Sequence, residues 1–267
     1  VNLRALDWEP KSVTGLVWFG RDTLVVAEFG GVTSGENQPT RNGKLHLLRG
    51  VLGANGPEAV TRETLVEGLA QPMGVWVKDG VIYLHEKGDQ GSEITKVWKE
   101  GGTWRHELFA KGWGEGEGYM WHSWPGGLVF HKGFWHFNFS SFLGDNYISK
   151  IQNGVRWPPT DRGSWIRMDP ATKEWKIMAT GLRTNVATWV GPWQELFTQD
   201  VQGEWLPDSK VINLREGRHY GHTYGGTAVK PESPPMAYCP QGDACFAPGE
   251  GVYLKNCLLY TSDAADE

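Results

Sequence analysis

Short apolar runs, separated by turn residues, recur along the chain. They are rich in β-branched and aromatic residues and are bounded by Gly, Asp or Asn, and four examples lie at residues 23–29, 81–85, 94–98 and 134–139. Runs of this length and composition are typical of β-strands, whereas apolar positions at helical spacing are scarce. The pattern predicts an all-β protein.

A two-strand unit occurs four times. Each copy has a Gly or Asn, an apolar run, a short turn and a second apolar run, and the copies begin at Gly15, Gly74, Gly127 and Asn185. Successive copies are therefore about 50 to 60 residues apart, which, with about four strands per unit, is typical of a β-propeller with insertions. A β-sandwich of similar strand content is the alternative, but it gives no reason for the near-equal spacing.

Further strands are expected between these units. Third strands are predicted at residues 44–49, 94–99, 147–152 and 210–215, and fourth strands at 105–110 and 175–180. Four blades then fit within residues 1–230, and residues 234–254 are expected to begin a fifth. Because propellers close into rings of about four to eight blades, the roughly four and a half blades counted here predict an incomplete propeller whose ring is left open.

The composition favours a folded chain whose partners are small molecules or proteins. Of the 267 residues, 36 are Gly and 15 are Trp, and 39% are hydrophobic, which is enough to build a core and excludes disorder. The net charge of −5, without any cluster of Lys and Arg, argues against a nucleic acid or an anionic membrane as partner. No stretch of the sequence is long and apolar enough for a membrane-spanning helix.

The end of the chain reads differently from the rest. Residues 257–267, CLLYTSDAADE, resemble the out-of-frame translation of a transposase sequencing adapter. We therefore interpret residues 1–256 as a partial propeller domain and residues 257–267 as a non-native tail. The first residue is Val1 rather than Met, which indicates that the start is missing too and leaves a signal peptide of the parent protein open. Cys239 and Cys245 are expected either to form a small disulfide loop, if the parent is exported, or to stay reduced.

Two longer segments carry a family resemblance. Residues 181–225 read GLRTNVATWVGPWQELFTQDVQGEWLPDSKVINLREGRHYGHTYG, and residues 234–254 read PPMAYCPQGDACFAPGEGVYL. In this order the phrases resemble the quinoprotein glucose/sorbosone dehydrogenases, and the resemblance extends over most of residues 12–256. It implies a β-propeller of the six-bladed quinoprotein dehydrogenase type, with pyrroloquinoline quinone (PQQ) and Ca²⁺ bound over the mouth of the propeller.

The resemblance also implies a general base. In the family a His takes the proton of the sugar hydroxyl while hydride passes to the quinone, and a base of near-neutral pKa suits that step. His122, in WHSWPGGLVF, occupies the corresponding place before an inner strand. It follows Trp121, where the family commonly has an Asp that orients the base. The alternative is a His packed between Trp121 and Trp124 as part of a structural or carbohydrate-stacking surface.

Cofactor contacts are carried over to a second group of residues. The resemblance implies that Arg183 contacts PQQ with Asn185 beside it, and the fork of an Arg suits an acidic, planar cofactor. Arg218 and His222, in GRHYGH, are expected on a later loop near the channel. In the alternative interpretation Arg183 closes a turn by binding backbone carbonyls, and the later loop is structural.

A metal site and a stacking surface complete the expected constellation. Asp200 is expected to hold Ca²⁺ together with Gln202 and Gly203, because Ca²⁺ prefers carboxylate and carbonyl oxygens. The alternative is that Asp200 caps a turn between strands. Most tryptophans are expected to wedge between blades, and three in channel-side loops are candidates for stacking on a sugar ring: Trp121, Trp124 and Trp205.

The function implied by the resemblance is a PQQ- and calcium-dependent oxidation of a sugar or aldose hydroxyl. A cytochrome c as electron acceptor and a periplasmic or extracellular location follow from the same resemblance. The alternative is a non-catalytic exported propeller that binds carbohydrate or a protein partner. A Ca²⁺-dependent lactonase-type propeller is a third candidate, but it needs more acidic and Asn side chains at the inner-strand starts than the sequence supplies.

Overall fold

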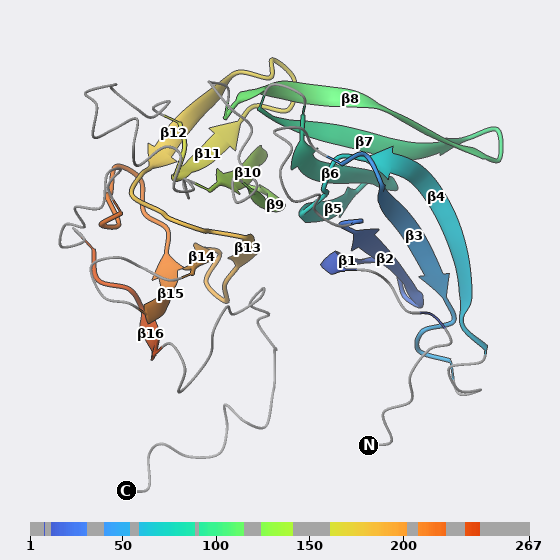
Figure 1. Ribbon diagram of the computed structural model, residues 1–267, viewed down its shortest axis with the longest axis horizontal. Helices are drawn as coiled ribbons and strands as arrows, with labels where there is room; N and C mark the ends of the chain where they lie inside the picture. The colour runs from blue at the N-terminus through green and yellow to red at the C-terminus, as the bar shows by residue number, and fades with distance from the viewer. Residues whose placement is uncertain are drawn as a thin grey trace, which may run out of the picture.

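The protein consists of four small antiparallel sheets in chain order. The computed structural model describes residues 8, 12–30, 40–53, 59–88, 91–114, 124–140, 161–201, 208–222 and 233–240. Within these ranges sixteen strands form four sheets of four strands each, as Figure 1 shows. The all-β prediction is confirmed.

The strand bounds follow the predicted two-strand units. The first sheet contains β1 (Val13–Gly20), β2 (Thr23–Glu28), β3 (Gly43–Arg49) and β4 (Thr61–Leu69). The second contains β5 (Gly74–Lys78), β6 (Val81–Lys87), β7 (Ser92–Glu100) and β8 (Thr103–Trp113). The third contains β9 (Pro125–His131), β10 (Phe134–Phe139), β11 (Ser164–Met168) and β12 (Trp175–Ala179). The fourth contains β13 (Ala187–Val190), β14 (Leu196–Asp200), β15 (Asp208–Asn213) and β16 (Ala237–Pro240).

The four sheets are the blades of a propeller. In each sheet the strands pair in the order in which they follow along the chain. The first strands of successive sheets also contact one another, β1 with β5, β5 with β9 and β9 with β13. These strands are therefore the inner strands, and Figure 1 shows the blades fanned out around them in an arc. Four separate sheets joined through their first strands exclude the β-sandwich.

Two of the inner hairpins close through two-residue turns with left-handed backbone. Asp79 and Gly80 have φ values of 51° and 76° between β5 and β6, and Lys132 and Gly133 have 47° and 85° between β9 and β10. Positive φ at both turn residues matches a type I′ turn, whose twist fits the flanking strands. The pairs Lys78↔Val81 and His131↔Phe134 close these turns and fix the register of both hairpins.

Apolar cores fill the spaces between neighbouring blades. The space between the second and third blades contains Ile94, Trp113, Trp135 and Phe137, with the rings of Trp113 and Phe137 4.6 Å apart. Trp113 and Trp135 are at most 1% exposed. They act as the wedges that the sequence predicts for most tryptophans, whereas Trp193 is 83% exposed and wedges between no blades.

Two strands were predicted at the wrong position in the sheets. The third strand of the third blade is β11, which pairs directly with β10, so residues 147–152, which lie outside the described residues, do not occupy that position. Residues 237–240 form β16, the fourth strand of the fourth blade, and do not begin a fifth blade. After β15 the chain first runs beside Thr180 and then pairs with β15 again as β16. Because this connection is long, the sequence did not reveal the pairing of β15 with β16. The rest of residues 234–254 beyond 240 lies outside the described residues.

The outermost strand β4 escaped prediction for a different reason. It reads TRETLVEGL, and only two of its nine residues are buried. A strand that is mostly exposed and rich in charged residues has no apolar alternation to detect.

Candidate functional site

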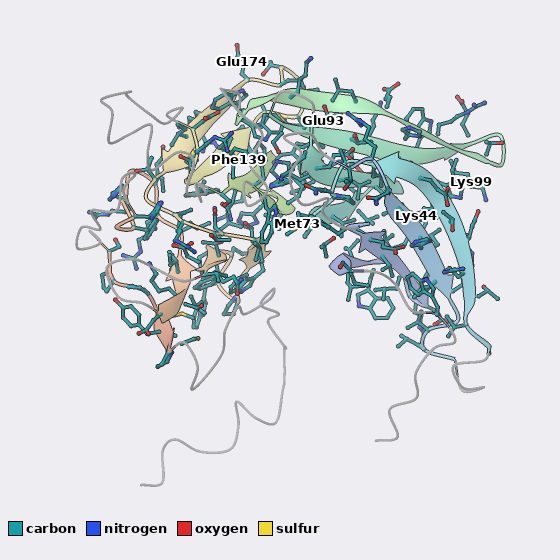
Figure 2. The ribbon with its side chains drawn as sticks, in the orientation of Figure 1. Lys44, Met73, Glu93, Lys99, Phe139 and Glu174 are labelled. Atoms are coloured by element: carbon teal, nitrogen blue, oxygen red, sulfur yellow. The ribbon has the colours of Figure 1, made fainter. Side chains whose placement is uncertain are left out.

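The candidate residues that the structure describes lie at one end of the blades, which we call the loop end. It is the end at which β5, β9 and β13 begin, after residues 70–73, 124 and 180–186, and at which β6, β10 and β14 finish. The opposite end, where the inner strands turn into the second strands, we call the hairpin end. Figure 2 shows Met73 and Phe139 near the inner strands and Lys99 and Glu174 at the outer edge of the fan.

Asp200 holds the Arg183 loop in place. Its Oδ1 accepts the backbone N–H groups of Arg183 and Thr184 at 2.9 and 2.7 Å, and its side chain is fully buried. Its Oδ2 lies 3.6 Å from the Nζ of Lys210, which is also buried. A carboxylate that accepts two loop amides organises a turn. These contacts match the alternative interpretation of Asp200, and its assignment to Ca²⁺ stays a prediction.

Arg183 is anchored through both its backbone and its side chain. Its Nη1 donates to the carbonyl of Val201 at 3.1 Å and to Thr184 Oγ1 at 3.3 Å. Ser140 Oγ donates to the Arg183 carbonyl at 3.1 Å. The half-buried guanidinium therefore lies between the ends of β10 and β14, at the loop end. Cofactor contact by Arg183 stays a prediction.

The side chain of Asn185 lacks hydrogen-bond partners among the described residues. It is fully buried, and within the described part of the chain neither its Oδ1 nor its Nδ2 has a hydrogen-bond partner. Buried amides normally have partners, because an unsatisfied donor or acceptor costs about 1–3 kcal/mol. Its backbone carbonyl lies so close to Gly126 that a Cβ there would sit 2.2 Å from it. Asn185 is thus a buried polar group at the start of an inner strand that a bound molecule could satisfy.

The segment that carries Arg218 and His222 runs beside the chain between β12 and β13. The amide of Thr180 donates to the Arg218 carbonyl at 3.0 Å, and the amide of His222 donates to the Gly181 carbonyl at 2.9 Å. The side chain of His222 is buried, and its amide pairs with Gly181, two residues before Arg183. The Arg218 side chain is exposed. The structure therefore brings His222 close to the Arg183 loop and leaves Arg218 beside the end of β12.

Trp124 is the one predicted stacking residue within the described ranges. It is half-buried, its ring meets that of Phe29 edge to face at 6.4 Å, and its carbonyl accepts the amide of Ser140. It thus joins the loop ends of the first and third blades. Five other predicted site residues lie outside the described residues: Trp121, His122, Gln202, Gly203 and Trp205.

Two buried cations at the loop end were not predicted. Lys87, the last residue of β6, is 1% exposed, and Arg162, just before β11, is 4% exposed. Burial, and secondarily the positive charge of Arg162, lower the pKa of Lys87 to about 6. The Arg162 guanidinium lies 4.9 Å from the centre of the Phe139 ring, and its Nη2 donates to the Gly114 carbonyl at 3.2 Å. Two cationic side chains are therefore buried together here, and at pH 7 Arg162 carries its charge while Lys87, with its lowered pKa, is largely neutral.

Two carboxyl groups line the same end. Glu86 is 2% exposed and accepts the amide of Ala70 at 2.7 Å, and its burial raises its pKa to about 7. Asp161 Oδ2 accepts the amide of Gly114 at 2.5 Å. Like Asp200, each of these two carboxyl groups holds backbone in place, either in a loop that precedes an inner strand or in the residues next to such a loop. No group of three His, Cys, Asp or Glu side chains in the described residues is arranged to hold a metal ion.

No sequence motif pointed to this charged cluster. Glu86 and Lys87 end the run VIYLHEK, which reads as a strand followed by two solvent-facing charges. They are buried because the neighbouring blade covers that end of β6, and a single sequence does not encode that contact in its local pattern.

Comparison with known proteins identifies the fold. No family model and no curated protein sequence matches the chain. Among solved structures, an oxidoreductase from Thermus thermophilus described as a glucose dehydrogenase superposes with a TM-score of 0.58 at 13% identity, over 90% of this chain and 72% of that one. The PQQ-bound aldose sugar dehydrogenase from Streptomyces coelicolor gives 0.57 at 15% identity, over 88% and 70%.

A third structure points in the same direction. It is the calcium structure of a carbohydrate-active enzyme from Trichoderma reesei, with a TM-score of 0.53 at 11% identity, over 84% of this chain and 60% of that one. At these identities the likeness shows the fold alone. The chain has the β-propeller fold of the PQQ-dependent sugar dehydrogenases, as the sequence predicts. The described residues contain no helix long and apolar enough to cross a membrane.

Proposed function

We propose that this chain is a quinoprotein sugar dehydrogenase-like propeller that holds PQQ at its loop end and oxidises a hydroxyl group of a sugar or aldose. The fold that it shares with a PQQ-bound aldose sugar dehydrogenase supports the proposal. The observation in this chain that carries it is the burial of two cationic side chains, Lys87 and Arg162, at that end.

The groups at the loop end fit an acidic, planar cofactor. A bound anion offsets the repulsion between Lys87 and Arg162, and it restores the charged state that burial disfavours in Lys87. Arg183 adds a second guanidinium from the facing loop, and the Asn185 amide offers a donor and an acceptor that lack partners. When bound, PQQ supplies the electron acceptor for alcohol oxidation.

The finer assignments follow the family resemblance. In the proposal His122 takes the proton of the sugar hydroxyl, and Arg183, Asn185, Arg218 and His222 contact the cofactor. Ca²⁺ is bound at Asp200 with Gln202 and Gly203, and the sugar stacks on three tryptophans at the mouth: Trp121, Trp124 and Trp205.

The remaining parts of the proposal concern the setting of the enzyme. A cytochrome c accepts the electrons, and the protein works in the periplasm or outside the cell. Residues 1–256 form the propeller domain and residues 257–267 a non-native tail. A binding module without catalysis is the second candidate, and Trp121 favours it because the family commonly has at that position an Asp that orients the His.

One experiment separates the two candidates. PQQ is titrated into the full chain with Ca²⁺ present, and dye reduction is measured with an aldose. Lys87→Met is expected to weaken PQQ binding by about tenfold, the loss typical of one charged contact, while Lys111→Met, on the exposed face of β8, leaves it unchanged. His122→Ala is expected to abolish dye reduction with PQQ binding intact.

Two results would contradict the proposal. Wild type that binds no PQQ, or Lys87→Met that binds it as tightly as wild type does, overturns cofactor binding at the loop end. Wild type that binds PQQ but reduces no dye with any aldose favours the binding module. Thermal melting of each variant checks that it is folded.

A further inference from the structure

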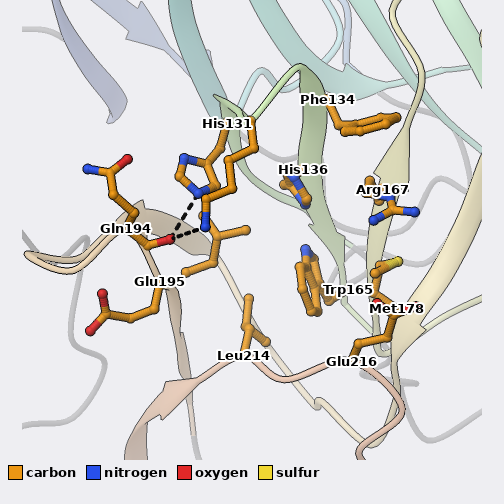
Figure 3. Close-up of a pocket in the computed structure, with 12 residues that line it drawn as sticks. His131, Phe134, His136, Trp165, Arg167, Met178, Gln194, Glu195, Leu214 and Glu216 are labelled. Carbon is orange, nitrogen blue, oxygen red and sulfur yellow. Dashed lines mark hydrogen bonds between the residues drawn. The ribbon is translucent and has the colours of Figure 1, made fainter.

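A cavity of about 280 Å³ lies between the third and fourth blades at the hairpin end. Figure 3 shows its lining residues, which come from the β9–β10 hairpin, from β11 and β12, and from the turn between β13 and β14. Its volume is close to the lower end of the range for small-molecule sites. None of the described residues that are predicted to contact PQQ lines this cavity, so it is not part of the proposed cofactor site.

The walls of the cavity are mostly apolar and aromatic. The rings of His136 and Trp165 stack with centroids 5.6 Å apart and an interplanar angle of 28°, and both residues line the cavity. The other apolar walls are made by Phe134, Met178, Leu196 and Leu214. Such walls favour a ligand with a flat, apolar body.

Two polar atoms on these walls have no hydrogen-bond partner among the described residues. They are Nδ1 of His136 and Nε1 of Trp165, on side chains that are only 5% and 6% exposed. Burial, followed by the charges of His131 and Arg167, lowers the pKa of His136 to about 4, so its ring is neutral at pH 7. The indole N–H can only donate, and it therefore requires an acceptor that the protein does not provide.

Among the described charged residues around the cavity, all but Arg167 form a hydrogen bond or an ion pair. The Glu216 carboxylate pairs with Lys176 at 3.0 Å, and the Glu195 carboxylate accepts the amide of Trp193 at 2.9 Å. The Lys132 ammonium and the His131 ring both bond the Gln194 carbonyl, at 3.1 and 3.0 Å, as the dashed lines in Figure 3 mark.

Arg167 differs from these neighbours. It is half-buried and lies over the Phe134 ring at 4.7 Å, and among the described residues it has no carboxylate within ion-pair distance. Arg167 and Trp165 both line the cavity, and a guanidinium and an indole N–H suit a carboxylate, because both groups donate to oxygen.

We propose that this cavity binds a small aromatic carboxylate. The aromatic ring of the ligand lies against the surface of His136 and Trp165, and its carboxylate accepts hydrogen bonds from Arg167 and from Trp165 Nε1. An aromatic amine fits less well, because the two carboxylates that would bind it already have partners. A neutral amide satisfies the indole but leaves the charge of Arg167 without compensation.

The test uses benzoate as the probe and the full chain without PQQ. Isothermal titration calorimetry is expected to show one benzoate site, with benzamide and benzylamine binding at least about tenfold more weakly, as expected when a charged contact is lost. Arg167→Gln is expected to weaken benzoate binding by about tenfold. Trp165→Phe keeps the ring, removes only the N–H, and is expected to weaken binding several-fold.

Matched controls use the same substitutions elsewhere. Arg105→Gln on the exposed part of β8 and Trp18→Phe, on the half-exposed face of β1, are expected to leave benzoate affinity unchanged. Wild type that binds no benzoate, Arg167→Gln that binds it normally, or benzamide that binds as tightly as benzoate overturns the proposal. Because Trp165 is a core residue, Arg167→Gln, at a half-buried position, remains decisive if Trp165→Phe does not fold. The affinity of Arg167→Gln for PQQ is expected to match wild type, so this test can fail independently of the proposed function.

Discussion

The two ends of the blades both contain buried polar groups without partners, but they surround them with different chemistry. At the loop end the unsatisfied amide of Asn185 lies among buried charges, which include Lys87, Arg162 and Asp200. At the hairpin end the unsatisfied atoms of His136 and Trp165 lie among apolar walls with a single available guanidinium. The loop end therefore suits a large, highly charged molecule, and the hairpin end suits a small molecule with one charge and an apolar body.

Two buried histidines show the same contrast at the level of one residue. His85 on β6 is fully buried, its Nδ1 donates to the Gly126 carbonyl at 2.8 Å, and its Nε2 accepts the Trp113 indole N–H at 2.9 Å. Burial lowers its pKa to about 3, so the ring is neutral and the indole fixes its tautomer. His136 occupies a similarly buried place on β10 but leaves Nδ1 unsatisfied. A buried His is therefore structural where both nitrogens have partners and a candidate contact where one lacks a partner.

The largest expected effect comes from removing the charge that orders the loop end. Asp200→Ala takes away the acceptor of two backbone amides and the counter-ion of buried Lys210. Breaking a buried pair in this way typically costs about 3–5 kcal/mol. Urea unfolding should show that loss for Asp200→Ala, a smaller loss for Asp200→Asn, which keeps an acceptor oxygen, and no change for exposed Glu174→Ala.

The same variants examine the predicted metal role of Asp200. If the residue binds Ca²⁺, added Ca²⁺ raises the melting temperature of wild type but not that of Asp200→Asn. A stability of Asp200→Ala equal to that of wild type would show that Asp200 does not organise the Arg183 loop.

A smaller effect distinguishes the two histidines. His85→Phe leaves the Trp113 indole and the Gly126 carbonyl without partners, and a loss of about 2–3 kcal/mol is expected for two buried groups. His136→Phe loses only a hydrogen bond to the backbone of His131, so its loss should be about 1 kcal/mol. Denaturation curves of both variants measure the difference. Equal losses would mean that the unsatisfied nitrogen of His136 has no energetic significance.

The local pattern of apolar and turn residues predicted those parts of the fold that depend on residues close together in the sequence. The inner hairpins follow from apolar runs around turn residues such as Asp79–Gly80, and their spacing predicted the blades. β16 was assigned to the wrong blade, because its pairing with β15 depends on how residues 214–236 return to the sheet. At the site, the segment singled out in the sequence contains Arg183, Asn185 and Asp200. Asp200 accepts the amide of Arg183, and the functional roles of the three residues stay predictions. The burial of Lys87 and Arg162 could not be predicted, because it arises where blades meet, between residues far apart in sequence.

A further expected effect is a change in how stability depends on pH. The pKa of Lys87 is lowered to about 6 in the folded protein, so between pH 6 and its ordinary value of 10.5 the unfolded chain binds more protons at this residue. Stability from this group therefore rises with pH across that window and is lost as pH falls toward 6. Its slope is at most about 1.4 kcal/mol per pH unit for one proton.

Lys87→Met should flatten the stability profile between pH 7 and 9, measured by urea unfolding, whereas Lys111→Met should not. Glu86 acts in the opposite direction in a lower window, since its pKa of about 7 makes the folded state bind more protons between pH 4.5 and 7. Glu86→Gln should therefore remove a decline in stability over that range. If Lys87→Met leaves the wild-type profile unaltered, burial does not lower the pKa of Lys87, and Lys87 stays charged at the loop end, where it adds to the charge of Arg162 and Arg183.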